Sequence, residues 1–469
     1  MKLKTLMMAG ACALTPLVLS PSASAFCGFY VAKAETDLFN EASKVAIARD
    51  GDRTVVTMAS DYQGEVSEFA MVIPVVDIPE EGQINVANPA LMDHLDAYTA
   101  PRLVEYFDPN PCERDLLYES VTVSARRNAP LPSAQIAQKA EDLGVTIEAE
   151  YEVGEYDILI LSAEQSDGLI TWLNQEGYNI PDGAEDTVDA YLKRDMKFFV
   201  AKVSLDRHDG NAELRPIQVA YEDEEFMLPI RLGTVNAQGK QELFVFAMNR
   251  TGRVETTNYR TVKLPSDMDV PVYLKDEFGE FYKDMFRHQV EKENGKAVFM
   301  EYAWDMNWCD PCAAEPLTTS ELRELGVHWL GNPNGPRPNE NVPVQPRRLI
   351  APQAADVFVT RLHLRYDAET FPEDLKFQAT GDRTNYQGRY VLRHAWRGDY
   401  EQCEAAGDYA NTLVDRWETE ATTLASLTGR DVNDIRARMA EEGMSAAGLG
   451  VETKPKKNWW QRLWGNDDE

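Results

Sequence analysis

The sequence lacks the short motifs that identify the common enzyme classes. It contains no GxSxG nucleophile elbow, no phosphate-binding P-loop and no glycine-rich dinucleotide fingerprint. The acidic run at residues 222–225 lacks the alternating oxygen ligands and the glycine of a calcium-binding loop. The sequence therefore predicts no catalytic motif, no cofactor and no metal site.

Histidine is scarce, with six residues, and no two of them form an HxH or HxxxH pair. His363 and His394 fall in predicted strands and could face each other. Isolated histidines on strands are usually ordinary core or surface residues. We therefore interpret all six as ordinary histidines and predict no site built on imidazole.

Long apolar runs are also missing, and no run after residue 25 approaches the length of about 20 residues that a membrane helix needs. The apolar stretch at residues 6–19 is too short to span a membrane. It follows a positively charged start, Met1–Lys4, and precedes the small residues of Pro21–Ala25. This arrangement is typical of a cleaved secretory signal. We expect cleavage near Ala25 and a soluble, periplasmic or secreted mature protein.

Basic residues are outnumbered, with 47 Lys and Arg against 78 Asp and Glu and a net charge of −31. Such an acidic surface repels nucleic acid and anionic lipid headgroups at long range. We therefore predict no nucleic-acid partner. The expected partner is an unknown envelope protein or a small ligand.

Cysteine is rare, and beyond the signal segment there are five: Cys27, Cys112, Cys309, Cys312 and Cys403. An exported protein meets an oxidising environment in which disulfides form. Because five is odd, at least one cysteine is free or pairs with another molecule. We predict the pairs Cys309–Cys312 and Cys27–Cys112, with a pairing of Cys403 to one member of the CxxC as the alternative.

The CxxC motif lies in Trp308-Cys309-Asp310-Pro311-Cys312, which is similar to the active-site motif of thioredoxins, and it follows a predicted strand. In thioredoxins the first cysteine lies at a helix N-terminus, which lowers its pKa. Here Thr318–Glu321 forms a capping box that starts a separate helix, predicted at residues 319–325. The proline-rich segment 331–346 occupies the place of the next strand. We favour a structural disulfide, and the alternative is a thiol–disulfide oxidoreductase with Cys309 as nucleophile and Cys312 as resolving thiol.

Hydrophobic periodicity predicts an α+β fold. Strands are predicted at residues 44–49, 54–59, 69–75, 156–161, 198–203, 217–221, 242–248, 297–304, 357–366 and 389–394, and helices at 88–103, 169–173, 187–194 and 410–427. An Asp50-Gly51 turn joins the first two strands as a hairpin. We expect antiparallel β-rich sheets with interspersed helices, two or three subdomains and a helical C-terminal segment.

The chain is too long for one ordinary hydrophobic core. We divide it into the signal peptide (1–25), an N-terminal α+β unit (26–150), a second α+β unit (151–295), a region with the CxxC and the proline-rich loop (296–405), a helical segment (406–450) and a basic, Trp-rich tail (451–469). In the tail, Trp459, Trp460, Leu463 and Trp464 form an interface candidate. This segment could contact a membrane surface weakly, dock on a partner or fold onto its own body.

Several segments together resemble an uncharacterised bacterial family, domain of unknown function 2330. The matching residues are Cys27-Gly28, Tyr191 and the segments 62–64, 69–75, 156–158, 169–178, 198–202, 228–232, 309–312, 360–362 and 388–390. The resemblance covers roughly residues 26–405 and implies an exported bacterial protein with no established activity. Together with the missing catalytic motifs, it leads us to expect a non-enzymatic binding or structural protein of the cell envelope.

Overall fold

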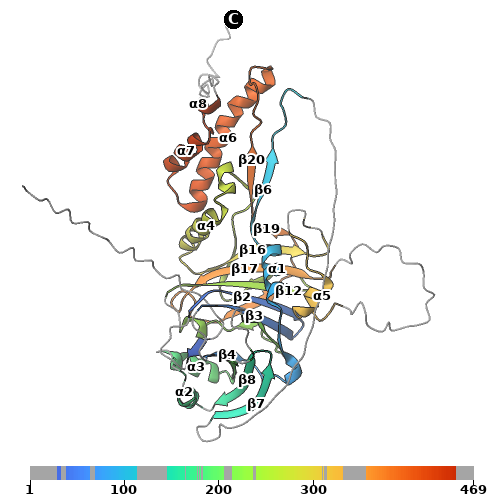
Figure 1. The fold of residues 1–469 in the computed structure, drawn as a ribbon, viewed down its shortest axis with the longest axis vertical. Coiled ribbons are helices and arrows are strands. Elements are labelled where there is room, and N and C mark those ends of the chain that lie inside the picture. Colours follow the sequence, from blue (N-terminus) through green and yellow to red (C-terminus); the bar gives the residue numbers. More distant parts are fainter. Residues whose placement is uncertain are drawn as a thin grey trace, which may run out of the picture.

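The protein forms an elongated molecule of three tiers in a computed structural model (Figure 1). The structure describes residues 29–32, 39–63, 69–113, 145–235 (apart from 164, 177, 179, 181–182, 205–206 and 208–213), 239–330 (apart from 309 and 311–313) and 355–449. A lower sheet carries two helices, a large sheet occupies the middle, and the two longest helices lie in the upper tier. None of the helices in the described part of the chain is long and apolar enough to cross a bilayer.

The middle tier is a nine-stranded, mostly antiparallel sheet. Its strands are β14 (Arg260–Lys263), β16 (Ala297–Asp305), β17 (Phe358–Tyr366), β12 (Gln241–Asn249), β2 (Phe39–Asp50), β3 (Arg53–Gln63), β10 (Ile217–Glu222) and β5 (Ile84–Val86) in spatial order, with β19 (Tyr386–Gln387) paired to β16. The predicted hairpin between β2 and β3 is confirmed, and Gly51 at its turn has a φ of 62°, a left-handed conformation that favours glycine.

Both faces of this central sheet are covered, and successive side chains of β12 point alternately to the two faces. Leu243, Val245 and Ala247 join the core cluster that faces the lower tier, whereas Phe246 and Met248 contact the helices on the other face. That second face is covered by α1 (Pro89–Thr99), α5 (Thr319–Glu324) and α4 (Phe278–Lys292). Central strands buried on both faces need apolar or paired side chains at every position.

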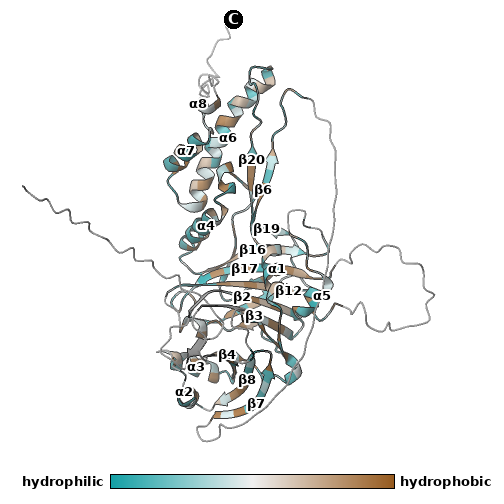
Figure 2. Cartoon of the chain, in the orientation of Figure 1, coloured by the Kyte–Doolittle hydropathy of each residue, from teal (hydrophilic) through white to brown (hydrophobic). Residues whose placement is uncertain are grey.

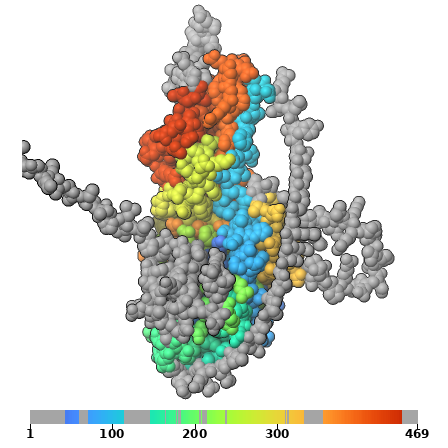
Figure 3. Space-filling model, in the orientation of Figure 1, coloured from blue at the N-terminus to red at the C-terminus, as the bar shows by residue number. Residues whose placement is uncertain are grey.

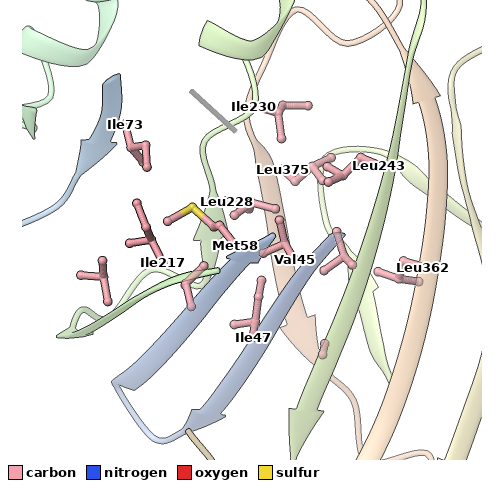
Figure 4. Close-up of a cluster of buried hydrophobic side chains, with 14 of the residues drawn as sticks. Val45, Ile47, Met58, Ile73, Ile217, Leu228, Ile230, Leu243, Leu362 and Leu375 are labelled. Carbon is pink, nitrogen blue, oxygen red and sulfur yellow. The ribbon is translucent and has the colours of Figure 1, made fainter. Parts of the chain in front are cut away.

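The lower tier is an antiparallel sheet of five strands, namely β1 (Phe29–Ala32), β4 (Phe69–Val75), β9 (Lys197–Val203), β8 (Tyr156–Ala163) and β7 (Val145–Val153). One face packs on the central sheet, where Ile73 meets Met58 and Ile217 in the main core (Figure 4). The other face is covered by α2 (Ser166–Gln175) and α3 (Ala184–Leu192). Strands of these two packed sheets are largely hydrophobic in Figure 2.

The upper tier contains a parallel sheet of three strands, β15 (Met268–Val270), β20 (Arg389–His394) and β6 (Arg102–Phe107). It packs against α4, α6 (Glu404–Thr428) and α7 (Val432–Glu441), and α8 (Ala446–Leu449) follows. A small fourth sheet of β11 (Met227–Leu228), β18 (Leu375–Ala379) and β13 (Val254–Thr256) lies beside the main core. The predicted α+β class with a helical C-terminal segment is confirmed.

One predicted helix was too long, and one helix was missed. Residues 88–103 divide into α1 and β6, because Pro101 disfavours helical backbone at Ala100, whose ψ is 146°. Asn88 caps α1 as predicted. Helix α4 was not predicted, although its buried positions Phe281, Met285 and Phe286 follow helical spacing. The capping box that starts α5 is confirmed, with Thr318 as its cap.

Candidate functional site

The sequence-predicted CxxC lies between described segments, since Cys309 and Cys312 are themselves outside the described residues. Strand β16 ends shortly before it at Asp305, and Trp308 is 68% exposed. Asp310, between the two cysteines, is buried, and its carboxylate accepts hydrogen bonds from the hydroxyl of Tyr302 (3.2 Å) and the amide of Gln387 (2.8 Å). The motif is therefore tied to the central sheet through Asp310.

The described residues after the motif do not resemble a thioredoxin frame. Residues 314–318 are bent or extended, and the next described helix, α5, begins only at Thr319. In thioredoxin-like sites the first cysteine caps a helix that runs on directly from the motif. The described flanks therefore contribute no helix dipole to a thiolate at this position.

A disulfide joins Cys112 to Cys403 across a sequence separation of 291. The predicted pair Cys27–Cys112 and the alternative pairing of Cys403 with the CxxC are both wrong. The reason lies in the upper tier: β6 pairs in parallel with β20, so the loop after β6 reaches the start of α6, where Cys403 is the cap residue. Cys27 lies outside the described residues, and so does the Trp-rich tail with Trp459, Trp460, Leu463 and Trp464.

The same part of the upper tier contains a cavity of about 700 Å³, which we call the upper cavity. It opens where β6 and β20 end and is bounded by α6, the end of α7 and α8; Figure 3 shows β6 (cyan) beside α6 (orange) at this end of the molecule. Its walls combine aromatic and basic side chains. Those used below are Phe107, Arg393, His394, Arg397, Tyr400 and Trp417. Small-molecule sites in proteins occupy roughly 300–1,000 Å³.

Most charged groups that line the upper cavity already have partners. Arg393 forms an ion pair with Asp269 at 3.0 Å, and Glu442 forms one with Arg438 of α7 at 3.3 Å. His394 hydrogen-bonds Glu105 at 2.7 Å. Arg397 differs, because within the described chain it forms neither an ion pair nor a hydrogen bond.

The walls of the upper cavity are cross-linked to each other. Asp108, next to Phe107, accepts hydrogen bonds from Tyr409 and from Arg416 on α6, each at 2.6 Å. The Cys112–Cys403 disulfide adds a covalent link between the same two segments. A pre-formed, braced cavity loses little conformational entropy when it binds a ligand.

Arg416 also lies close to a buried acid, Glu420, and we call these two residues the Arg416–Glu420 pair. Glu420 is 0% exposed, and its carboxylate lies 3.6 Å from Nε of Arg416, too far for a hydrogen bond. Among the described residues neither carboxylate oxygen has a hydrogen-bond partner. Burial raises the pKa of Glu420 to about 8; Arg416 opposes this rise, and Asp269 and Asp108 add to it. Glu420 is therefore mostly protonated at neutral pH.

A second group of buried charges, the central ionic cluster, lies between the central sheet and helices α1 and α4. Glu301 on β16 is its centre: Nε of Arg361 donates to one carboxylate oxygen at 2.6 Å, and Nδ1 of His363 donates to the other at 2.7 Å. The hydroxyl of Tyr282 also donates to Glu301, and Arg361 extends the cluster to Asp96 on α1. The rings of Phe286 and Phe244 stack on opposite sides of the His363 imidazole at centroid distances of 3.6 and 4.0 Å.

The charges of the central ionic cluster stabilise each other. Burial alone raises the pKa of Glu301, but the charges of His363 and Arg361 outweigh it and lower the pKa. Burial alone lowers the pKa of His363, and Glu301 reverses this effect, with Glu242 adding to it. Glu301, Arg361 and His363 are 0–5% exposed and line none of the described cavities. The cluster has the groups for proton transfer but no space for a substrate.

Sequence reasoning identified neither the central ionic cluster nor the upper cavity. His363 and His394 do not face each other, since they lie on the separate sheets of β17 and β20. Trp417 falls in the helix predicted at residues 410–427, and it lines the upper cavity as well as the upper core. Phe107 had no recognisable signal, because parallel pairing over almost 300 residues brings it to His394.

Comparison with known protein families matches residues 21–378 to a family described as an uncharacterized protein conserved in bacteria, DUF2330. No curated protein and no solved structure matches the chain. The central ionic cluster lies inside the matched range, whereas the upper cavity lies beyond it except for Phe107 and Val272. Because the match spans most of its length, the chain belongs to the DUF2330 family of conserved bacterial proteins.

Proposed function

We propose that this protein is an exported, non-enzymatic binding protein of the cell envelope that holds a small ligand in the upper cavity. The observation that carries the proposal is the cavity itself: about 700 Å³, lined by Phe107, Tyr400 and Trp417 together with basic side chains. Concave sites with aromatic walls and a few placed polar groups are typical of small-molecule binding. The braced walls support binding without large rearrangement.

Two features support export. The N-terminal segment has the composition of a secretory signal. The Cys112–Cys403 disulfide is compatible with an oxidising compartment, because such bonds are rare in reducing cytosol.

The enclosure of the central ionic cluster supports a binding role rather than catalysis. Glu301, His363 and Tyr282 are the acid–base combination that a hydrolase or isomerase would use. A catalytic group must reach within hydrogen-bond distance of the reacting atoms, and these side chains are covered by α4 and the aromatic rings of Phe244 and Phe286. Their arrangement fits a structural role.

The proposal is tested with 8-anilinonaphthalene-1-sulfonate, an aromatic dye whose fluorescence rises in apolar sites. We expect saturable binding to the wild-type protein and loss of that binding in Ala395→Trp, which fills the cavity from the residue that follows β20. Ala379→Trp, at an exposed position on β18, is the matched control and should bind as the wild type does. Equal binding by all three proteins, or none by the wild type, would contradict the proposal.

A second candidate function is thiol–disulfide exchange by Cys309 and Cys312. The exposure of Trp308 favours it, since this neighbour of Cys309 is 68% exposed. Catalytic thiols need solvent access and a thiolate at neutral pH. An insulin-reduction assay tests this function: turnover that disappears in Cys309→Ser would support it, and no turnover by the wild type would refute it.

A further inference from the structure

We infer that the ligand of the upper cavity is an organic anion with an apolar or aromatic body, and that Arg397 binds its charge. This inference deepens the proposed function and rests on it. It follows from three features of the cavity: its basic groups, the pairing of those groups, and its aromatic walls.

The first feature is the local charge. The protein carries a net charge of −31, yet the cavity is lined by Arg393, Arg397 and His394 against a single acid, Glu442. The acidic side chains that follow Arg397 in sequence do not line the cavity. Asp399 accepts a hydrogen bond from the backbone of Glu401 at 2.9 Å. The cavity is therefore a basic site on an acidic protein.

The second feature is that the other charged side chains of the cavity form ion pairs within the protein. Arg393 is neutralised by Asp269 at 3.0 Å, and Glu442 by Arg438 at 3.3 Å. Lys275 and His394 share Glu105, at 2.8 and 2.7 Å. Arg397 is the cavity cation for which the described chain supplies no anion. A guanidinium binds a carboxylate, sulfonate or phosphate through two parallel hydrogen bonds, so an anionic ligand supplies its missing partner.

The third feature is the apolar part of the wall. Phe107 is 72% exposed, and its ring stacks on that of His394 at a centroid distance of 4.4 Å and an angle of 10°. Trp417 and Tyr400 line the cavity on the α6 side. Exposed aromatic rings beside a cavity gain free energy when a ligand covers them. A ligand with a flat or apolar body therefore suits these walls better than a small inorganic anion.

The test uses compounds of one shape and different charge: 2-naphthoate, 2-naphthalenesulfonate and 2-naphthyl phosphate as anions, and 2-naphthamide as the neutral analogue. Binding is measured by calorimetry and by displacement of the anilinonaphthalene dye. We expect the anions to bind about tenfold more tightly than the amide, as one charge-assisted contact allows. The three anions also distinguish carboxylate, sulfonate and phosphate sources of the same chemistry.

The variant Arg397→Gln should weaken anion binding about tenfold and leave the amide unchanged, because it removes only the charge. Arg397→Lys should retain part of the anion preference. The matched control is Arg53→Gln, which removes an exposed arginine from the β2–β3 hairpin and should leave all affinities unchanged. Raising the NaCl concentration should weaken naphthoate binding more than amide binding.

Failure of this inference is distinguishable from failure of the proposed function. If naphthoate and naphthamide bind equally, or if Arg397→Gln affects both equally, the cavity binds ligands but does not select anions, and the inference is wrong. If the dye and all four naphthalene compounds fail to bind the wild type, the proposed function and the inference are both wrong.

Discussion

The central ionic cluster and the Arg416–Glu420 pair differ in how many hydrogen bonds their buried carboxyl groups accept. In the central ionic cluster both carboxylate oxygens of Glu301 accept hydrogen bonds, from Arg361 and from His363. In the Arg416–Glu420 pair, both oxygens of Glu420 lack a hydrogen-bond partner within the described chain, although the side chain is fully buried. The first group lies within the family-matched range, and the second lies beyond it, beside a cavity.

The difference concerns how completely the buried polar atoms of each region are hydrogen-bonded. A buried carboxylate whose two oxygens both accept hydrogen bonds, as those of Glu301 do, fixes the elements that it joins, here α4 and two central strands. A buried polar group that lacks hydrogen bonds costs free energy, and proteins usually keep such groups only where they serve a purpose. The central cluster therefore supports the fold, whereas the upper tier contains buried polar atoms that the described chain leaves without hydrogen bonds.

The largest effect is expected from Glu301→Gln, which would break the central cluster. The change leaves Arg361 and His363 buried without their shared anion and should lower the free energy of unfolding by about 3–5 kcal/mol. Urea unfolding followed by circular dichroism measures the change, with Glu81→Gln at an exposed position as the control. A loss below about 1 kcal/mol would show that the cluster is not the support inferred above.

The same cluster predicts a pH dependence. The pKa of Glu301 is lowered in the folded state, so its contribution is present above its ordinary value of 4.5 and is lost as the pH falls through the lowered pKa. The pKa of His363 is raised, so its contribution is complete below 6.5 and is lost as the pH rises through the raised value. The Glu301→Gln variant loses the main group that raises the pKa of His363, so its stability should fall less than that of the wild type as the pH rises above 6.5, measured by urea unfolding at several pH values.

A smaller effect is expected from Cys403→Ser, which opens the braced wall of the upper cavity. Loss of a disulfide that closes a long loop typically costs about 2–4 kcal/mol. Differential scanning calorimetry should show a lower melting temperature for the variant. Dithiothreitol should lower the melting temperature of the wild type more than that of a Cys112→Ser/Cys403→Ser double variant; equal sensitivity of the two proteins would contradict the role of this bond.

Glu420→Gln should stabilise the protein, and only at higher pH. Because the pKa of Glu420 is raised to about 8, the folded state holds a proton that the unfolded state releases above its ordinary value of 4.5. This contribution to stability is complete below 4.5 and is lost as the pH rises through about 8. Glutamine resembles the protonated acid, so the variant should match the wild type at pH 5 and exceed it by roughly 1–3 kcal/mol at pH 9. Equal stability at both pH values would show that Glu420 is not kept protonated.

The smallest effect on stability is expected from substitution of Arg397, and it can be compared directly with substitution of Arg361. Arg397→Gln should change the free energy of unfolding by less than about 0.5 kcal/mol, as is usual for exposed side chains without partners. Arg361→Gln, in the central cluster, should cost about 3–5 kcal/mol. Chemical unfolding of both variants measures the contrast, and similar losses would remove the distinction between a supporting and a binding arginine.

The sequence predicted local features well and long-range ones poorly. The β2–β3 hairpin, the Asn88 cap and the Thr318 capping box depend on neighbouring residues, and each was found where expected. The Cys112–Cys403 bond and the upper cavity depend on β6 pairing with β20. Nothing in either strand's own composition specifies its partner, so no local pattern could have identified them.

The Glu301 cluster was hidden for a related reason. Its charged side chains come from α1, β16 and β17, and each lies in a segment that reads as an ordinary amphipathic or buried element. A buried charge is visible in a sequence only when its partner is close along the chain. Here the partners are separated by 60 residues or more.

The Cys112–Cys403 bond also limits when during synthesis of the chain the fold can be completed. Its two sulfurs are separated by 291 positions in the sequence, so the bond can close only after the chain has been synthesised as far as Cys403. Strand β6 pairs with β20, so this pairing also forms only after β20 has been synthesised. A chain that ends before Cys403 therefore leaves Cys112 without this partner, so the bond is a chemical record that synthesis has passed Cys403.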